Sequence, residues 1–180
     1  MEKLVVKYFD GDLLNADVDF IFHQVNCEGI MGAGIAKMIK AKWPKVFNEY
    51  KSYVNNSYRD KDLYKVMRYE GDYLMVDITE YAHTKASHVV NVFGQINISE
   101  RGGRCTKYDL VLNALERFCT MNFGLFQKDK TPDRKIILGF PYKFGCGLAR
   151  GDWRIMEPLI LSAFEKYADV VEVHFYKYNK

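Results

Sequence analysis

The stretch Val25-Asn-Cys-Glu-Gly-Ile-Met-Gly-Ala-Gly-Ile-Ala36 follows the apolar run Phe20-Ile-Phe22. Its three glycines let the backbone adopt positive φ and let another group approach without meeting a Cβ. A helix is indicated next, because apolar residues recur at helical spacing until Pro44 ends the run: Ile35, Met38, Ile39 and Trp43. The order is therefore buried strand, glycine loop and helix N-terminus. Unpaired N–H groups and the positive end of a helix dipole then meet at one place, which suits a phosphate group.

The loop matches neither of two common phosphate-binding motifs. The P-loop requires Lys and then Ser or Thr after its last glycine, whereas Gly34 is followed by Ile35 and Ala36. The dinucleotide fingerprint requires Gly or Ala where Lys37 stands. A tight structural turn is the alternative to anion binding.

Beyond this loop, strand patterns alternate with helical ones. We expect strands at residues 4–9, 20–25, 64–69, 73–78, 88–93, 136–140 and 170–176. We expect helices at 35–43, 44–54, 108–121 and 152–167, a hairpin turn at 70–72 and a long exposed loop at 122–135. This alternation predicts an α/β domain whose mostly parallel sheet lies between helical layers. Ligands of such sheets bind beyond the carboxyl ends of the strands.

The composition is that of an ordinary globular protein. The chain has 180 residues, 48% of them hydrophobic and 27% charged, with a net charge of +3. We therefore expect one domain over residues 1–180, a monomer, with too mild a charge to predict nucleic-acid binding. No apolar run reaches the roughly 20 residues of a membrane span. Charges interrupt the first residues, and the cysteines and histidines lack zinc spacing, so we expect a cytoplasmic protein without a signal peptide, metal or membrane contact.

Three motifs together resemble the macro domain, the ADP-ribose-binding fold. They are Gly11-Asp-Leu13, the Asn26-Cys-x-Gly-x-Met-Gly-x-Gly-Ile-Ala36 loop, and Gly145-Cys-Gly-Leu148 followed by Trp153. They occur in family order and span almost the whole chain. The resemblance implies a three-layer α/β/α macro domain fold with a central mixed, mostly parallel sheet. It also implies ADP-ribose or a derivative as ligand, no cofactor, and ADP-ribosylated protein or nucleic acid as further partners.

The resemblance implies which residues bind the adenine end of the ligand. Asp12, followed by Leu13, would accept a hydrogen bond from the adenine amino group; the alternative is a turn or cap aspartate. Tyr176 matches a family aromatic that covers the adenine, and the alternative is a core aromatic.

The resemblance assigns the other end of the ligand to the two glycine loops. Asn26 would hold the distal ribose, because its amide both donates and accepts; the alternative is a strand-end cap. Backbone around the distal ribose and pyrophosphate would come from Gly32, Ala33, Gly34 and Ile35. An anion nest would come from Phe144, Gly145, Cys146, Gly147 and Leu148. We assign no nucleophile role to the cysteines, because neither Cys27 nor Cys146 has a base beside it in sequence.

The sequence lacks residues that are typical of two catalytic branches of the family. Branches that remove ADP-ribose from protein or DNA carry a lysine just after the strand equivalent to 89–93, where this chain reads Phe93-Gly-Gln-Ile-Asn97. A second such branch has an aspartate where Ala149 stands, and Asp152 is either a substitute or a helix N-cap. Both differences count against a lysine-dependent glycohydrolase. Whether Gln95 or Asn97 enters the site is left open.

His23 favours a different branch. It lies three residues before Asn26 and matches a histidine of the ADP-ribose 1''-phosphate phosphatases, which implies catalytic roles for His23 and Asn26. Strand alternation puts His23 on the opposite face from Asn26, so a buried core histidine is the alternative unless a bulge intervenes. We expect a phosphatase that releases ADP-ribose and phosphate. The alternatives are an ADP-ribosyl hydrolase acting on modified protein or nucleic acid and a non-catalytic ADP-ribose-binding module.

Overall fold

A computed structural model describes residues 2–58, 71–98, 103–129 and 134–179. In chain order the elements are β1 (Val5–Asp10), the short 3-10 helix η1 (Leu13–Asn15), β2 (Phe20–Val25), α1 (Gly34–Lys42), α2 (Pro44–Tyr58), β3 (Tyr73–Asp77), β4 (His88–Phe93), α4 (Tyr108–Asp129), β5 (Ile136–Pro141), α5 (Trp153–Phe164), the 3-10 helix η2 (Glu165–Tyr167) and β6 (Val171–Lys177). The strands form one sheet in the order β1-β6-β5-β2-β4-β3. Every neighbouring pair is parallel except β3 and β4. The mixed, mostly parallel sheet that we expected is confirmed.

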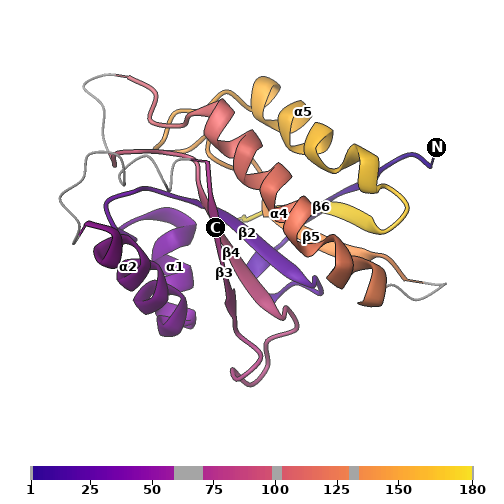
Figure 1. Ribbon diagram of the computed structural model, residues 1–180, viewed down its shortest axis with the longest axis horizontal. Coiled ribbons are helices and arrows are strands. Elements are labelled where there is room, and N and C mark those ends of the chain that lie inside the picture. The colour runs from indigo at the N-terminus through magenta and orange to yellow at the C-terminus, as the bar shows by residue number, and fades with distance from the viewer. Residues whose placement is uncertain (1, 59–70, 99–102, 130–133, 180) are drawn as a thin grey trace.

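Helices cover the sheet on both sides. Figure 1 shows α1 and α2 together on one side and α4 and α5 together on the other. Strand alternation explains the division: Phe20 and Phe22 of β2 face the α4 and α5 layer, whereas Ile21 and Val25 face the α1 and α2 layer. The three-layer α/β/α arrangement follows from this pattern.

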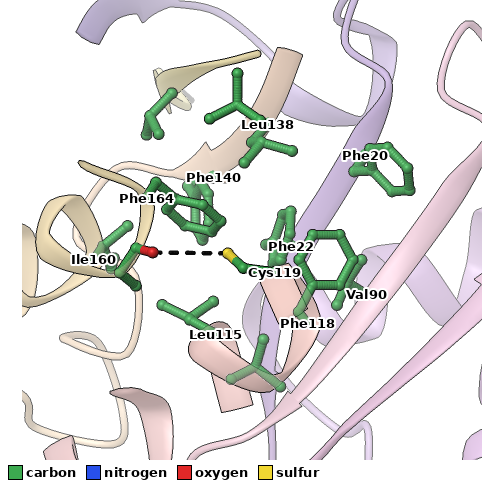
Figure 2. Close-up of a cluster of buried hydrophobic side chains, with 14 of the residues drawn as sticks. Phe20, Phe22, Val90, Leu115, Phe118, Cys119, Leu138, Phe140, Ile160 and Phe164 are labelled. Atoms are coloured by element: carbon green, nitrogen blue, oxygen red, sulfur yellow. Dashed lines mark hydrogen bonds between the residues drawn. The ribbon is translucent and has the colours of Figure 1, made fainter. Parts of the chain in front are cut away.

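The core beneath α4 and α5 is built from aromatic rings. Phe22 stacks on Phe140 of β5 at 4.4 Å between ring centroids and meets Phe118 of α4 edge-on at 4.8 Å. Figure 2 shows these rings closing the space between the sheet and the two helices, with the Cys119 thiol donating to a backbone oxygen of α5. Burying each ring contributes roughly 2 kcal/mol, so this side anchors the strands whose ends form the candidate site.

The expected elements agree with the structure in most places and fail in one. The strands at 20–25 and 88–93 are confirmed, and the expected loop at 122–135 is wrong, because α4 continues to Asp129. The Asn122 amide donates to the Phe118 carbonyl and the Tyr73 hydroxyl, and Phe126 is buried, so this turn is held from within. The strand expected at 64–69 lies outside the described residues, and β3 pairs antiparallel with β4.

Two features are absent from the described part of the chain, a membrane-spanning helix and a cluster of metal-binding side chains. Within it, no helix combines the length and the apolar character that crossing a membrane requires. No cluster of three or more His, Cys, Asp or Glu side chains in these ranges could hold a metal ion.

Candidate functional site

Two cavities, each of about 460 Å³, lie at the carboxyl ends of β2, β5 and β6. They share four lining residues, Gly34, Ile35, Pro141 and Tyr142, and therefore adjoin each other; we refer to the pair as the groove. The first cavity lies between the two glycine loops. Its lining includes Asn26, Gly32, Ala33, Gly34, Ile35, Phe144, Gly145, Gly147 and Leu148. The fold thus brings together loops that lie more than a hundred residues apart in the sequence.

Asn26 shapes the first loop through its own side chain. Its Oδ1 accepts hydrogen bonds from Glu28 N (2.9 Å), Ile30 N (3.2 Å) and the Tyr50 hydroxyl (2.8 Å). Its Nδ2 donates to Ile30 O at 2.7 Å. The amide oxygen is fully engaged, and one Nδ2 hydrogen is left for a ligand. Asn26 therefore acts first as the capping residue of this loop, and it also lines the cavity.

Tyr50 is a contributor to the site that the sequence pattern did not reveal. It is a buried residue of α2, and its hydroxyl lies 2.7 Å from Asn26 O and 3.2 Å from Ile30 N. Burial raises the pKa of this phenol, so its proton stays available for donation. Helical spacing alone identified Tyr50 only as a core residue, and no local signal pointed to the loop.

The start of α1 is open to a ligand. Of the three glycines of the loop, Gly29 and Gly34 have positive φ, +74° and +54°, whereas Gly32 does not. The N-cap residue Ala33 provides no side-chain hydrogen bond to the first turn. The first-turn N–H groups and the positive end of the helix dipole therefore face the first cavity without a side-chain cap, an arrangement that favours an anion.

Cys146 differs from its neighbours in the second loop, because it is absent from the residues that line either cavity. Its Sγ lies 3.2 Å from Phe144 O. Burial raises the pKa of this thiol to about 11, so it remains protonated near neutral pH. The backbone N–H of Cys146 donates to Lys143 O at 2.9 Å, so neither the thiol nor this N–H serves the anion nest that the sequence predicts.

The second cavity gathers the residues expected at the adenine end. It is lined by Asp12, Leu13 and Tyr176, among others. Asp12 caps η1, since Oδ1 accepts from Leu14 N (2.9 Å) and Oδ2 accepts from Asn15 Nδ2 (2.6 Å). Tyr176 stacks on Phe9 with 5.1 Å between centroids and 19° between planes. Asp12 is thus a helix cap, as the alternative interpretation proposes, and it also lines the cavity.

His23 lies away from both cavities. Its side chain is completely buried, and Nε2 donates to Asn91 Oδ1 at 2.7 Å, while the Asn91 amide nitrogen donates to Leu74 O. Burial lowers the pKa of this imidazole to about 4, which keeps it neutral. Strand β2 is regular up to Val25, so no bulge turns His23 toward Asn26. The geometry does not support the catalytic role that we expected for His23, and it favours the buried core histidine.

The remaining polar candidates fall into two groups, side chains that line a cavity and side chains that do not. Asp152 is the N-cap of α5: its carboxylate accepts hydrogen bonds from the Arg154 side chain and, through Oδ1, from Arg154 N at 3.0 Å. These hydrogen bonds lower the pKa of the carboxyl. Neither Asp152 nor Asn97 is among the residues lining the two cavities, whereas Gln95 lines the first. Gln24 lines it as well, although sequence reasoning gave it no role.

The lining of the first cavity has a distinctive chemistry. Among the described residues around it there is no histidine and no carboxylate, and Lys143 is the one charged side chain. Besides Tyr142 and Lys143, the polar groups of this lining are backbone N–H groups and side-chain amides. Such groups bind phosphates and sugar hydroxyls, but they do not supply a general acid or base near neutral pH.

Comparison with known proteins agrees with this geometry. No protein-family model matches the chain. A stretch of 46 residues is 44% identical to a DNA ADP-ribosyl glycohydrolase of Mycobacterium tuberculosis, covering 26% of this chain and 13% of that relative. A stretch of 48 residues is 44% identical to an ADP-ribose 1''-phosphate phosphatase of Aspergillus fumigatus, covering 26% and 24%. The matched stretches thus span less than a quarter of either relative.

Solved structures are similar over nearly the whole chain. The macrodomain of Mycobacterium tuberculosis DarG superposes with a TM-score of 0.70 at 25% identity, covering 96% of this chain and 97% of that one. Thermosipho africanus DarTG, solved in complex with ADP-ribose, gives a TM-score of 0.69 at 17% identity over 96% of this chain and 41% of that one. The protein therefore has the macrodomain fold, and it resembles the macro domain family in sequence as well.

Proposed function

We propose that this protein binds ADP-ribose along the groove, with the adenine in the second cavity and the phosphates and distal ribose in the first. One observation carries the proposal: a cavity lined by aromatic rings and a carboxylate adjoins a cavity built from two glycine loops. Adenine requires a stacking surface and an acceptor, which Tyr176 and Asp12 provide. Two linked phosphates require clustered N–H donors, which the loops provide.

We further propose hydrolysis of ADP-ribose 1''-phosphate to ADP-ribose and phosphate. Because the described lining of the first cavity holds no histidine and no carboxylate, a leaving group that departs without a proton from the protein fits this cavity best. Phosphate does so when the bond between C1'' and oxygen breaks. Water then attacks C1'', phosphate leaves with the bonding electron pair, and the proton of the water passes to solvent. The loop N–H groups stabilise the departing anion.

The test is phosphate release from ADP-ribose 1''-phosphate in water enriched with the heavy oxygen isotope. The proposal expects turnover with no heavy oxygen in the released phosphate, because the bond that breaks lies between C1'' and the bridging oxygen. Heavy oxygen in the phosphate would mean attack at phosphorus and would overturn the proposed bond cleavage. Asp12→Ala serves as the binding control, because it should weaken ADP-ribose affinity without touching the glycine loops.

A second candidate function is removal of ADP-ribose from DNA. It is favoured by the 44% identity to a DNA ADP-ribosyl glycohydrolase over 46 residues. An ADP-ribosylated oligonucleotide, assayed beside ADP-ribose 1''-phosphate, distinguishes the two by which substrate releases ADP-ribose. A protein that binds ADP-ribose but turns over neither substrate would be a binding module.

A further inference from the structure

The side chain of Gln24 lies between the segment after β4, which includes Gln95, and the loop after β5, which includes Gly145. Its Nε2 donates to Gln95 Oε1 at 2.8 Å and to Thr106 Oγ1 at 3.1 Å. Both of its amide hydrogens are therefore in use. Gln24 and Gln95 line the first cavity, whereas Thr106 is completely buried behind it.

Two glycines make room for the Gln24 amide. A Cβ at Gly145 would lie 2.6 Å from Gln24 Oε1, and a Cβ at Gly94 would lie 2.8 Å from the same atom. Both distances are far below van der Waals contact. The amide of Gln24 is thus enclosed by backbone from the segment after β4 and from the loop after β5, and its orientation is fixed on both sides.

The Thr106 hydroxyl determines which atom donates and which accepts in each hydrogen bond of this network. Its hydroxyl donates to Gly145 O at 2.6 Å. The hydroxyl oxygen, Thr106 Oγ1, can then only accept from Gln24 Nε2. Because Gln24 also donates to Gln95 Oε1, the amide nitrogen of Gln95 has to point the other way. There it donates to Asn97 O at 3.3 Å, and its second hydrogen is directed by the same fixed amide plane.

From this arrangement we propose that Gln95 donates its remaining Nε2 hydrogen to an oxygen of the group carried on C1'' of the distal ribose, and that Gln24 and Thr106 are positioning residues that orient it. The inference rests on the proposed function. A fixed neutral donor at this point stabilises charge that develops on a leaving oxygen, and it needs no titration to act.

Gln95→Leu is the primary test, because it removes the donor and keeps a side chain of similar length. We expect kcat/KM for ADP-ribose 1''-phosphate to fall about tenfold while the Kd for ADP-ribose, which lacks the leaving group, stays within about twofold. Asn97→Ala is the matched control and should change neither value. An unchanged kcat/KM in Gln95→Leu would overturn the inference.

Thr106→Val and Thr106→Ser test the positioning role. The valine variant loses the bond to Gly145 O, so kcat should fall with little change in KM, whereas serine keeps the hydroxyl and should restore kcat to within about twofold. A kcat that follows thermal stability alone in both variants would show a merely structural role.

The failure of this inference can be told apart from failure of the proposed function. If the wild-type protein binds ADP-ribose without turning over ADP-ribose 1''-phosphate, the proposed hydrolysis fails. The 1''-phosphate then serves as a ligand in calorimetry. Gln95→Leu should weaken its binding and leave ADP-ribose binding unchanged; equal affinities of wild type and variant for the 1''-phosphate would overturn the role of Gln95.

Discussion

The two glycine loops present the same backbone chemistry to the groove but are held in different ways. The first is fastened from within, because the Asn26 side chain bonds to the backbone of its own loop and to the buried hydroxyl of Tyr50. The second is fastened by backbone hydrogen bonds, from Cys146 N to Lys143 O (2.9 Å) and from Gly151 N to Gly145 O (3.0 Å), and by the Thr106 hydroxyl of another segment, which donates to Gly145 O. The two loops that we propose to bind the anion are therefore held by different sets of hydrogen bonds.

The difference has consequences for mutation. Damage to the first loop should reach the core of α2, since Tyr50 is buried there. Damage to the second should reach the Gln24 network and the reacting end of the ligand. Stability and activity should thus separate between the two loops.

Lowering the pH should have the largest effect on stability, through His23 of β2, the strand that leads into the first loop. His23 has a pKa of about 4 in the folded protein against 6.5 when exposed. Because the folded pKa is the lower one, its contribution to stability is present above pH 6.5 and is lost as pH falls toward 4. The gap corresponds to roughly 3 kcal/mol. Urea unfolding of wild type and His23→Gln across this range measures it; the variant should show a flatter profile, and parallel profiles would contradict the assignment.

Asn26→Ala should give the next largest effect. It removes the acceptor of Glu28 N and one of the two acceptors within reach of both Ile30 N and the Tyr50 hydroxyl, which should lower the free energy of unfolding by about 2 kcal/mol and weaken ADP-ribose binding. Asn26→Asp keeps the acceptor oxygen and should recover part of the stability. Equal stability of the alanine variant and wild type would break the contrast drawn above.

Gly145→Ala should disturb the second loop. The added Cβ would lie 2.6 Å from Gln24 Oε1 at a residue with φ of +69°, and we expect a cost of about 1.5 kcal/mol together with a loss of turnover. Gly147→Ala is the matched control for stability, because a Cβ there meets nothing within 4 Å. Thermal unfolding compares the two, and equal shifts would argue against the enclosure of Gln24.

Tyr50→Phe should give the smallest effect and sharpens the comparison most. It removes one hydroxyl that serves the first loop while keeping the ring, so we expect a loss of about 1 kcal/mol and a measurable drop in ADP-ribose affinity. Calorimetry with ADP-ribose is the measurement. Full affinity with lowered stability would mean that Tyr50 serves only the core.

The sequence by itself determined the strand, loop and helix order around Val25 to Ala36, and with it the parallel sheet and the place of the groove. These features depend on local periodicity and on glycine conformation, which neighbouring residues specify. The extension of α4 beyond Met121 escaped this reasoning. Its last turns depend on the hydrogen bond from Asn122 to Tyr73, a residue of strand β3.

Only the tertiary structure decided which polar side chains serve the groove. His23 is buried by Asn91, 68 residues away, and Gln24 meets Thr106, 82 residues away. Alternation along β2 assigned His23 and Gln24 to opposite faces, but it could not say what each face would meet. The physical reason is that a hydrogen bond is satisfied by proximity in space, so the role of a polar residue depends on a partner that its sequence neighbours do not specify.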